Sequence, residues 1–303
     1  MFNIEKRGYV ALSFCLLVLF WGSSFAVVKV GLEHSPTMLF AGLRSLVGGL
    51  AMLAVALVWG GRPKLLREWR AFALLTLFNV VIFIGLQTYA VMTLPSGTAA
   101  ILVYLQPILV GFFAWMMLGE TLSVAKVAGL FLGFTGIVAV SAGGISGSAP
   151  PEGVVFGAGS ALAWALGTVY FKRVQERVSS LWSVAAPFVI GGAILTGIGA
   201  VTEPVAGISW NGEFVASLAY SSLLGIAAAW VIWFGLVRSG EASRVSAYIF
   251  VVPLTAVAIG VVFLGEPLRA TLILGAVLVV TGVYLVNRSP GKNAGPEPSS
   301  DIR

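Results

Sequence analysis

Charged and reactive residues are scarce in this chain. Among its 303 residues there are one cysteine and one histidine, and Asp, Glu, Lys and Arg together make up 10%. Soluble domains carry about 25% charged residues, so this composition excludes an ordinary soluble globular fold. The single cysteine, Cys15, can form neither a disulfide framework nor a metal pair, and inside an apolar run we expect it to be a buried small hydrophobe. The sequence also has no nucleophile–base pair, metal cluster or Gly-rich phosphate loop, so it predicts neither an enzyme nor a bound cofactor or metal.

Apolar residues are abundant, at 58% of the chain, and the mean hydropathy is +0.99. A spanning helix needs roughly 20 consecutive apolar residues, and the apolar runs are continuous, which excludes the alternating strands of a porin-like barrel. Runs between charged or Gly/Pro breaks predict an all-α integral membrane protein with ten transmembrane helices, at residues 9–31, 37–59, 71–91, 97–118, 126–143, 154–172, 182–201, 214–236, 244–263 and 270–287. Residues 289–303 are rich in Pro, Gly, Ser and charge, which predicts a disordered cytoplasmic tail.

The basic residues of the connecting loops are unevenly distributed between the two predicted sides. One side carries Arg269, with Lys29 at a helix end. The other side carries Lys6, Arg7, Arg62, Lys64, Arg67, Arg70, Lys126, Lys172, Arg173, Arg177, Arg238, Arg244, Arg288, Lys292 and Arg303. Because Lys and Arg accumulate in cytoplasmic loops, both termini are predicted to be cytoplasmic. The net charge of +6 therefore reflects membrane topology, and no nucleic acid is expected as a partner.

The chain contains an internal repeat at a constant offset. Pairs 146 residues apart are Pro107 and Pro253, Leu118-Gly119-Glu120 and Leu264-Gly265-Glu266, Gly129 and Gly275, and Gly136 and Gly282, and pairs 143 apart are Trp21 and Trp164, Lys29 and Lys172, and Gly48-Gly49 and Gly191-Gly192. These pairs predict one repeat at 1–143, a linker at 144–153 and a second repeat at 154–288. Five helices per repeat is an odd number, so the second repeat is inverted relative to the first. Inverted repeats place a substrate site near the membrane midplane and permit alternating access, which favours a secondary transporter.

Several motifs resemble those of the drug/metabolite transporter superfamily, among the EamA-type exporters. They are FWGSSF in the first helix, the late-helix prolines, the LGE-x-L corners at 118–122 and 264–268, and the five-plus-five repeat, which together cover residues 9–287. Within the superfamily the chain is similar to the aromatic amino acid exporter group. The resemblance implies a basket in which helices 1, 3, 4, 6, 8 and 9 surround a cavity and helices 5 and 10 lie outside.

The resemblance also implies the direction of transport, which is export across a cytoplasmic (inner) membrane. Aromatic amino acids and related amphipathic organics are the expected cargo. A broad drug or other metabolite exporter of the same fold is the alternative, followed by a membrane scaffold that transports nothing. The expected partners are a small-molecule substrate and the lipid bilayer, and the chain is expected to be a monomer or homodimer.

Two tryptophans are candidates for the cavity wall. Trp21 and Trp164 are equivalent in the repeat and lie well inside their predicted helices, beside small residues that include Ser24 and Thr168. A buried indole N–H needs an acceptor, and lipid-facing packing is the alternative to cavity lining. The other tryptophans fall near predicted membrane boundaries, with Trp230 one turn deeper, so they are interpreted as an aromatic belt: Trp59, Trp69, Trp115, Trp182, Trp210, Trp230 and Trp233.

The third predicted helix has a polar face, because Asn79, Phe83 and Gln87 are spaced i, i+4 and i+8. Amides in hydrocarbon are costly unless paired, so this face is expected to point inward, for either ligand contact or interhelical hydrogen bonds. Further candidate substrate-binding residues are Tyr104, Tyr220, Ser246 and Tyr248. Pro107 and Pro253 are candidate hinges, because proline kinks a helix and frees a carbonyl one turn earlier.

Ionisable groups inside the predicted helices are few. Arg44 lies about 10 Å inside the second helix, at 1.5 Å per residue, and either pairs with Glu33, binds headgroups or attracts a substrate carboxylate. All twelve acidic residues fall in loops, helix ends or tails. Glu120 and Glu266 are interpreted as helix caps or as partners of Lys126 or Arg269. Without a membrane-embedded carboxylate or histidine, the chain is predicted to be a facilitator or exchanger.

Overall fold

The computed structural model describes residues 4–63, 67–94, 96–141, 150–255 and 270–288. Every regular element among them is a helix, which confirms the all-α prediction. Seven described helices are long and apolar enough to cross a membrane, and three shorter apolar helices fall at the remaining predicted segments, at Val124–Ala139, Ala242–Thr255 and Ile273–Arg288. The predicted tail at 289–303 and most of the predicted linker lie outside the described residues.

The helix bounds follow the hydropathy pattern closely, since the apolar runs are long enough to define each helix. The elements are α1 (Ile4–Glu33), α2 (Thr37–Trp59), α3 (Trp69–Thr76), η1 (Leu77–Ile82), α4 (Phe83–Thr93), α5 (Ser96–Val103), α6 (Gln106–Leu118), α7 (Val124–Ser141), α8 (Pro151–Val174), α9 (Ser180–Thr202), η3 (Val205–Gly207), α10 (Gly212–Tyr220), η4 (Ser221–Ala228), α11 (Ala229–Ser239), α12 (Ala242–Ala247), η5 (Tyr248–Phe250) and α14 (Ala270–Arg288). Each predicted segment begins within three residues of a helix start, except the first, whose helix begins at Ile4.

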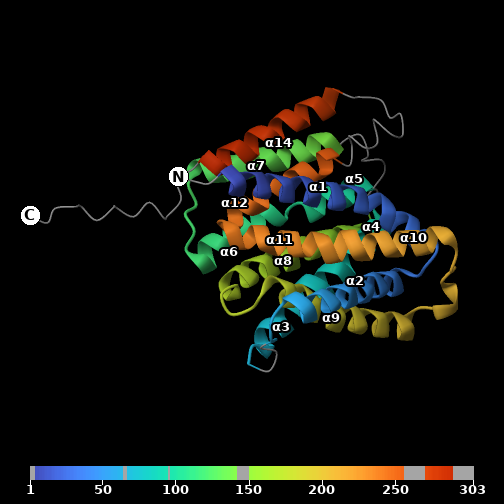
Figure 1. The fold of residues 1–303 in the computed structure, drawn as a ribbon. Coiled ribbons are helices and arrows are strands. Elements are labelled where there is room, and N and C mark those ends of the chain that lie inside the picture. The colour runs from blue at the N-terminus through green and yellow to red at the C-terminus, as the bar shows by residue number, and fades with distance from the viewer. Residues whose placement is uncertain (1–3, 64–66, 95, 142–149, 256–269, 289–303) are drawn as a thin grey trace, which may run out of the picture.

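Helices from the first five predicted segments pack against helices from the last five. The two most extensive contacts join α2 to α9 and α7 to α14, and the α7–α14 pair lies side by side along the top edge of the bundle in Figure 1. Helix α1 packs against α10, η4 and α11, and α8 packs in the corresponding way against α3, η1 and α4. The bundle is therefore built from contacts between residues far apart in the sequence.

Glycines bring the paired helices into close contact. A Cβ added to Gly49 would lie 2.5 Å from the backbone nitrogen of Val189, and one added to Gly136 would lie 2.7 Å from the carbonyl oxygen of Gly275. Gly129 and Gly282 meet in the same way, each against the other's carbonyl oxygen. Small residues let helix backbones approach inside a membrane, where the hydrophobic effect does not drive helices together. The glycines that repeat in the sequence thus serve helix packing.

Two of the long helices change their hydrogen-bonding pattern in the middle. The helix at 69–93 contains the π-helical segment η1, and the helix at 212–239 contains the π-helical segment η4. Their first residues, Leu77 and Ser221, are separated by an offset close to that of the sequence repeat. The helices carrying the predicted hinges are also interrupted, at Tyr104–Leu105 before Pro107 and at the 3₁₀ turn η5 before Pro253. Isolated π-helical turns inside α-helices are frequent at functional sites.

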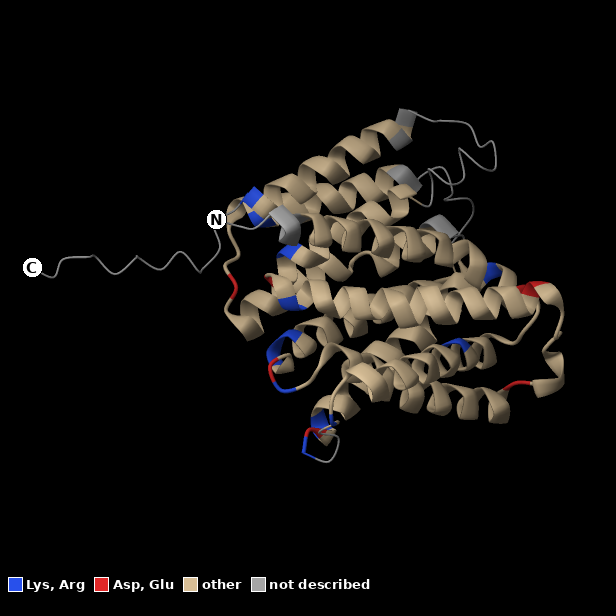
Figure 2. Cartoon of the chain, in the orientation of Figure 1, with Lys and Arg blue, Asp and Glu red and all other residues tan. Residues whose placement is uncertain are grey.

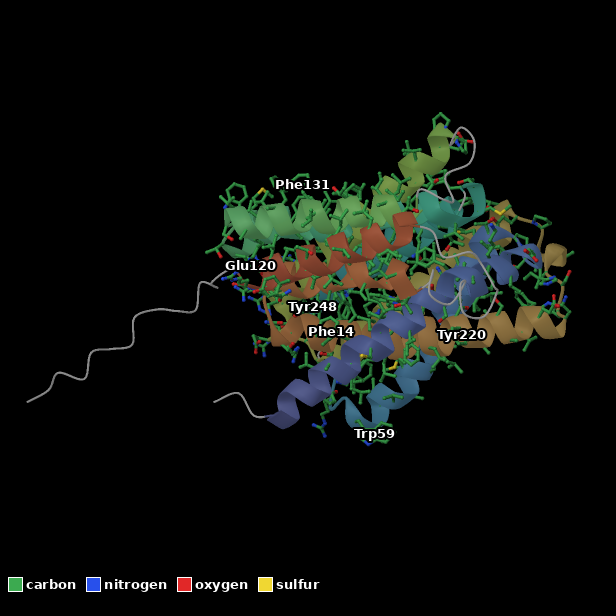
Figure 3. The ribbon with its side chains drawn as sticks, turned by 90° about the horizontal axis from the view of Figure 1, so that it is seen from above. Phe14, Trp59, Glu120, Phe131, Tyr220 and Tyr248 are labelled. Carbon is green, nitrogen blue, oxygen red and sulfur yellow. The ribbon has the colours of Figure 1, made fainter. Side chains whose placement is uncertain are left out.

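The outer faces of the helices are apolar. Leu57, Val155 and Val201 are exposed, and Phe131 on α7 and Trp59 at the end of α2 point away from the bundle in Figure 3. So many exposed apolar side chains would be unfavourable in water, so these faces suit contact with lipid tails. Cys15 belongs to this surface, because it is exposed on α1. Its predicted burial is therefore wrong; the apolar run around it faces outward at that position.

Lys and Arg gather at the end of the bundle where the N-terminus lies, whereas fewer of them lie toward the opposite end, where acidic residues also occur (Figure 2). We call the first the basic end. Arg67, Arg70 and Arg177 line one hollow there, and Arg238 donates to the carbonyl oxygen of Val178 beside it. There the carboxylate of Glu120 accepts the backbone N–H groups of Ala242, at 2.6 Å, and Ser243, at 3.2 Å, at the start of α12. The predicted helix-cap role of Glu120 is confirmed, and its oxygen also lies 3.9 Å from Nζ of Lys126.

Candidate functional site

A cavity lies inside the bundle, between its middle and the end opposite the basic end. The space within its wall and mouth is about 580 Å³, which includes open solvent, and about 40 Å³ of it is accessible to the centre of a water molecule. Most of its wall is aromatic or aliphatic, and its polar groups come from a few side chains, as is usual for small-molecule sites. It is lined by Trp21, Ser24, Phe25, Val28, Arg44, Phe83, Ile84, Gln87, Thr88, Val91, Val103, Tyr104, Trp164, Gly225, Ile226 and Trp230.

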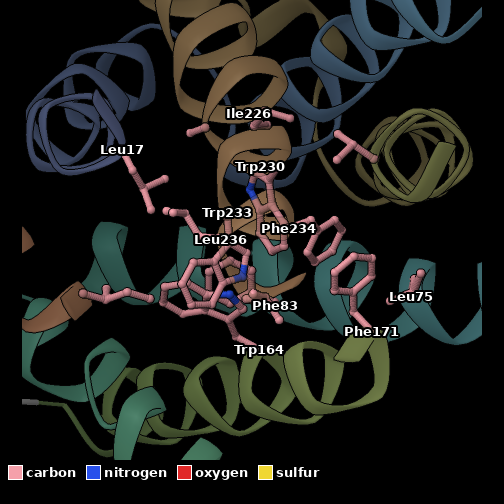
Figure 4. Packing of buried hydrophobic residues seen from close by; sticks show 14 of the residues in the cluster. Leu17, Leu75, Phe83, Trp164, Phe171, Ile226, Trp230, Trp233, Phe234 and Leu236 are labelled. Atoms are coloured by element: carbon pink, nitrogen blue, oxygen red, sulfur yellow. The ribbon is translucent and has the colours of Figure 1, made fainter. Parts of the chain in front are cut away.

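A cluster of aromatic rings closes the cavity on the side of the basic end. The ring centroids of Trp21 and Trp164 lie 5.2 Å apart, edge to face, and Phe83 stacks on Trp164 at 4.9 Å. Trp230 and Trp233 complete the cluster, with centroids 6.1 and 5.8 Å from that of Trp21. Figure 4 shows Phe83 of α4, Trp164 of α8, and Trp230 and Trp233 of α11 converging. Edge-to-face and offset-stacked rings are the favourable geometries, so the cluster is a well-packed barrier.

The two central tryptophans differ in their hydrogen bonds. Nε1 of Trp21 donates to the carbonyl oxygen of Gly225 in η4, at 3.1 Å. Nε1 of Trp164 is buried and has no acceptor among the described residues. The equivalent positions in the repeat are thus in unequal environments.

Arg44 supplies the charge of the cavity wall. Its side chain is 5% exposed, and its Nη2 donates to Oε1 of Gln87 at 3.3 Å and to Oγ1 of Thr88 at 3.2 Å. Its Nε has no partner, and no carboxylate of the described residues forms an ion pair with it. The predicted pairing with Glu33 is wrong: Glu33 is exposed at the end of α1, and Arg44 turns inward to the neutral groups of α4.

The structure brings seven of the predicted binding residues together around this one cavity. They come from five of the predicted helices and are Trp21, Ser24, Arg44, Phe83, Gln87, Tyr104 and Trp164. Helix α2 contributes through Arg44, although the resemblance did not imply α2 as a lining helix. Helices α7 and α14 contribute nothing to the described lining, as the resemblance implied.

The other predicted binding residues lie outside the cavity. Tyr220 shares a hydrogen bond of 2.6 Å with Ser23, which joins α10 to α1, and Tyr248 packs on Phe14 with ring centroids 4.4 Å apart. Figure 3 shows the Phe14–Tyr248 pair away from Tyr220. Asn79, Thr168 and Ser246 are buried on the basic-end side of the aromatic cluster.

These three residues and Gln106 form what we call the inner polar group: Asn79, Gln106, Thr168 and Ser246. Nε2 of Gln106 donates to Oγ1 of Thr168 at 3.4 Å. Both amide atoms of Asn79, Oε1 of Gln106 and Oγ of Ser246 are buried without a partner among the described residues. Buried unpartnered polar atoms are uncommon in native structures and call for an explanation.

Sequence reasoning missed part of the cavity wall. Trp230 and Trp233 were interpreted as belt residues, and both interpretations are wrong, because these residues are 1% and 0% exposed and lie in the aromatic cluster. The same interpretation is wrong for Trp182, which is 4% exposed and whose Nε1 donates to the carbonyl oxygen of Gly61 at 3.0 Å. For Trp230 the sequence did contain a signal, because this residue is one helical turn deeper than the predicted membrane boundary. Thr88 also escaped notice, since it is one position beyond Gln87 and off the predicted polar face. Trp59, Trp69, Trp115 and Trp210 are exposed, as an aromatic belt requires.

A bundle of apolar helices with a central cavity of this kind defines a multi-pass membrane protein with a small-molecule site. Comparison with known families gives the same class: the model of the EamA-like transporter family matches residues 8–142 and again residues 151–288. The chain therefore belongs to the EamA-like transporter family and is a transporter, not an enzyme.

Individual relatives agree with this family. The chain is 42% identical over 277 residues to the Bacillus subtilis protein named uncharacterized transporter YvbV, covering 91% of each chain. It is 28% identical to the Salmonella typhimurium protein named probable amino-acid metabolite efflux pump, covering 93% of this chain and 94% of that one. It is also 28% identical to the Escherichia coli uncharacterized inner membrane transporter YedA, covering 90% and 91%.

A solved crystal structure has the same fold. It aligns with a TM-score of 0.76 at 22% identity, over 92% of this chain and 96% of that one. At this identity the likeness concerns the fold alone.

Proposed function

We propose that this transporter exports aromatic amino acids and related amphipathic organics through the described cavity by alternating access. The observation that carries the proposal is the composition of the cavity wall. Trp21, Trp164 and Phe83 offer flat apolar surfaces at one end, and Arg44, Gln87 and Tyr104 offer hydrogen-bond donors and acceptors nearby. An aromatic ring with a polar end has groups that match both parts. The Salmonella relative is named a probable amino-acid metabolite efflux pump, which supports cargo of this size.

Alternating access is supported by the unequal environments of equivalent residues. Two inverted repeats, at 1–143 and 154–288, would exchange their arrangements when the transporter turns from one side to the other. The hydrogen bond from Trp21 to η4 would then be replaced by one from Trp164 to η1, against which α8 already packs. The inner polar group fits the same cycle, since its unpartnered atoms would line a cavity open toward the basic end. In this interpretation the interruptions before Pro107 and Pro253 act as hinges.

The basic end is proposed to be cytoplasmic, because Lys and Arg accumulate on that side of membrane proteins. The cavity then opens to the outside, and the aromatic cluster closes the path to the cytoplasm. The membrane is proposed to be the cytoplasmic or inner membrane, in keeping with the Escherichia coli relative, which is named an inner membrane transporter.

The test is solute counterflow with the purified full chain in liposomes. Vesicles loaded with phenylalanine or tryptophan are expected to accumulate the labelled form of the amino acid that they contain. Vesicles loaded with alanine are not expected to accumulate labelled alanine. Transport of none of these would contradict aromatic cargo, and accumulation of structurally unrelated drugs would favour the broad-exporter alternative. A scaffold would move no solute at all.

Variants of the aromatic cluster connect this flux to the cavity. Trp21→Ala and Trp164→Ala are each expected to weaken aromatic transport by about tenfold, since an aromatic contact contributes roughly 0.5–1.5 kcal/mol beyond burial and 1.4 kcal/mol is a factor of ten. Trp115→Ala is the matched control, because Trp115 is exposed on the outer face of α6. If both cluster variants reach the membrane and transport aromatics normally, the tryptophans only pack.

A further inference from the structure

Arg44 is a buried cation whose charge is not compensated within the described protein. Its hydrogen bonds go to the neutral side chains of Gln87 and Thr88, and its Nε remains unpartnered. Burying a charge is costly unless it is paired, and a cation facing a cavity attracts an anion from solution. The other buried cation of the described residues, Lys126, shows the usual arrangement: its Nζ lies 3.1 Å from Glu241 and 3.9 Å from Glu120.

Two carboxylates at the end opposite the basic end are occupied elsewhere, and Glu33 and Glu152 at that end are exposed and do not line the cavity. Glu203 accepts the backbone N–H groups of Met38 and Leu39 at the start of α2, both at 2.9 Å. Glu213 lies 2.9 Å from Nε2 of His34. The described lining contains no aspartate or glutamate, so Arg44 gives it a net charge of +1.

The spacing between this charge and the aromatic surface fits one small molecule. Gln87, which accepts from Arg44, lies one turn of α4 beyond Phe83, a rise of about 6 Å at 1.5 Å per residue. Phe83 stacks on Trp164. A carboxylate bound at Arg44 and a ring lying at the level of Phe83 would therefore be joined by an arm of two or three atoms.

We propose that the cavity selects aromatic carboxylates with a net negative charge over the corresponding zwitterionic amino acids, and excludes aromatic amines. The inference rests on the proposed function and narrows its cargo class. A guanidinium binds a carboxylate through two parallel hydrogen bonds, whereas an ammonium group beside it is repelled and meets no carboxylate in the described wall. Gln87 and Thr88 hold the guanidinium in place without neutralising it.

The experiment compares three ligands that share one ring system. Indole-3-propionate is an anion, tryptophan a zwitterion and tryptamine a cation. Each competes against labelled indole-3-propionate for binding to the purified full chain in detergent and for counterflow in liposomes. We expect half-maximal competition by indole-3-propionate at a concentration about tenfold or more below that of tryptophan, with tryptamine weakest.

Variants assign this preference to Arg44. Arg44→Gln should remove the difference between indole-3-propionate and tryptophan, and Arg44→Lys should retain part of it, because the charge stays while the planar fork is lost. Binding of neutral 3-methylindole should change little in either variant. Lys29→Gln is the matched control, since Lys29 is an exposed cation on α1 and its removal should leave the preference intact.

The outcomes separate the two proposals. If no indole ligand binds or is transported, aromatic cargo is wrong and the inference falls with it. If tryptophan competes as well as or better than indole-3-propionate in the unmodified protein, the charge preference is wrong while the proposed function stands. This comparison needs no variant, so it remains decisive even if Arg44→Gln fails to fold. A preference that survives in Arg44→Lys and Arg44→Gln alike would also overturn the role of Arg44.

Discussion

At the scale of single residues, the partners of a buried charge separate structural from functional groups. Lys126 is completely buried, yet Glu120, Glu241 and Oγ of Ser243, which is 3.0 Å away, surround its ammonium group. Its role is to join the start of α7 to the start of α12. Arg44 has neutral partners and faces a cavity, which is the situation expected of a ligand-binding cation.

Glu120→Gln tests the structural side of this distinction. The amide would lose the charge that accepts from Ala242 and Ser243 and that faces Lys126, so the free energy of unfolding should fall by about 1–2 kcal/mol. Thermal unfolding in detergent measures the loss. Glu176→Gln removes an exposed carboxylate and should leave the melting temperature unchanged. Equal effects of the two substitutions would show that the cap does not contribute.

At the scale of helices, the fold depends on close backbone approach at a few crossings and on irregular turns at a few others. The crossing of α2 and α9 buries Gly49 and Gly192, which are equivalent in the repeat, while their neighbours Gly48 and Gly191 pack against η4 and η1. The irregular turns η1 and η4 stand beside the aromatic cluster, where Gly225 of η4 accepts from Trp21. Close helix crossings combined with interrupted helices suit a bundle in which groups of helices move relative to one another.

Gly49→Ala should destabilise the α2–α9 crossing. The added methyl group would lie 2.5 Å from the backbone nitrogen of Val189, and a backbone neighbour can move away only if the helices separate. We expect a loss of about 1–3 kcal/mol, seen as a lower melting temperature in detergent. Gly197→Ala is the control on α9, because nothing lies within 4 Å of its added Cβ and alanine is the better helix former. If neither substitution lowers the melting temperature, the α2–α9 crossing is not tightly packed at Gly49.

At the scale of the whole molecule, charge distribution determines how the bundle sits in the membrane. The basic end carries the Lys- and Arg-rich connections (Figure 2). Reporter fusions after residue 65 should therefore indicate the cytoplasm, and fusions near residue 148 the outside. Activity of an alkaline phosphatase and a fluorescent protein fused at each point measures the two sides. The opposite pair of signals would overturn the proposed orientation.

Energy coupling is also a property of the whole molecule. The described cavity wall contains no carboxylate or histidine, and Glu120 is occupied by the N–H groups of Ala242 and Ser243. A proton relay needs a titrating group on the transport path, so the protein should act as a facilitator or exchanger. Counterflow in liposomes at equal pH on both sides should proceed. Flux that requires an imposed proton gradient would contradict this prediction.

The sequence by itself determined the properties that depend on local composition. An apolar run of about 20 residues defines a spanning helix wherever it occurs, so the helix positions, the all-α class and the uneven distribution of basic residues followed directly. The repeated prolines, glycines and tryptophans likewise follow from comparing one half of the chain with the other. A cap was one of the two roles predicted for Glu120, but the helix that it caps, α12, begins more than 100 residues later, and no local pattern identifies that helix.

Only the tertiary structure decided which side chains meet. In a soluble helix the polar face shows which side is exposed, but here lipid-facing and buried sides are both apolar, so hydropathy does not encode how a helix is rotated. Trp230 and Trp233 therefore looked like boundary residues, and Tyr248 and Ser246 looked like cavity residues. The hydrogen-bond partners of Arg44 depend on how α2 packs against α4. These partners are Gln87 and Thr88, and no local pattern in the sequence favoured them over Glu33.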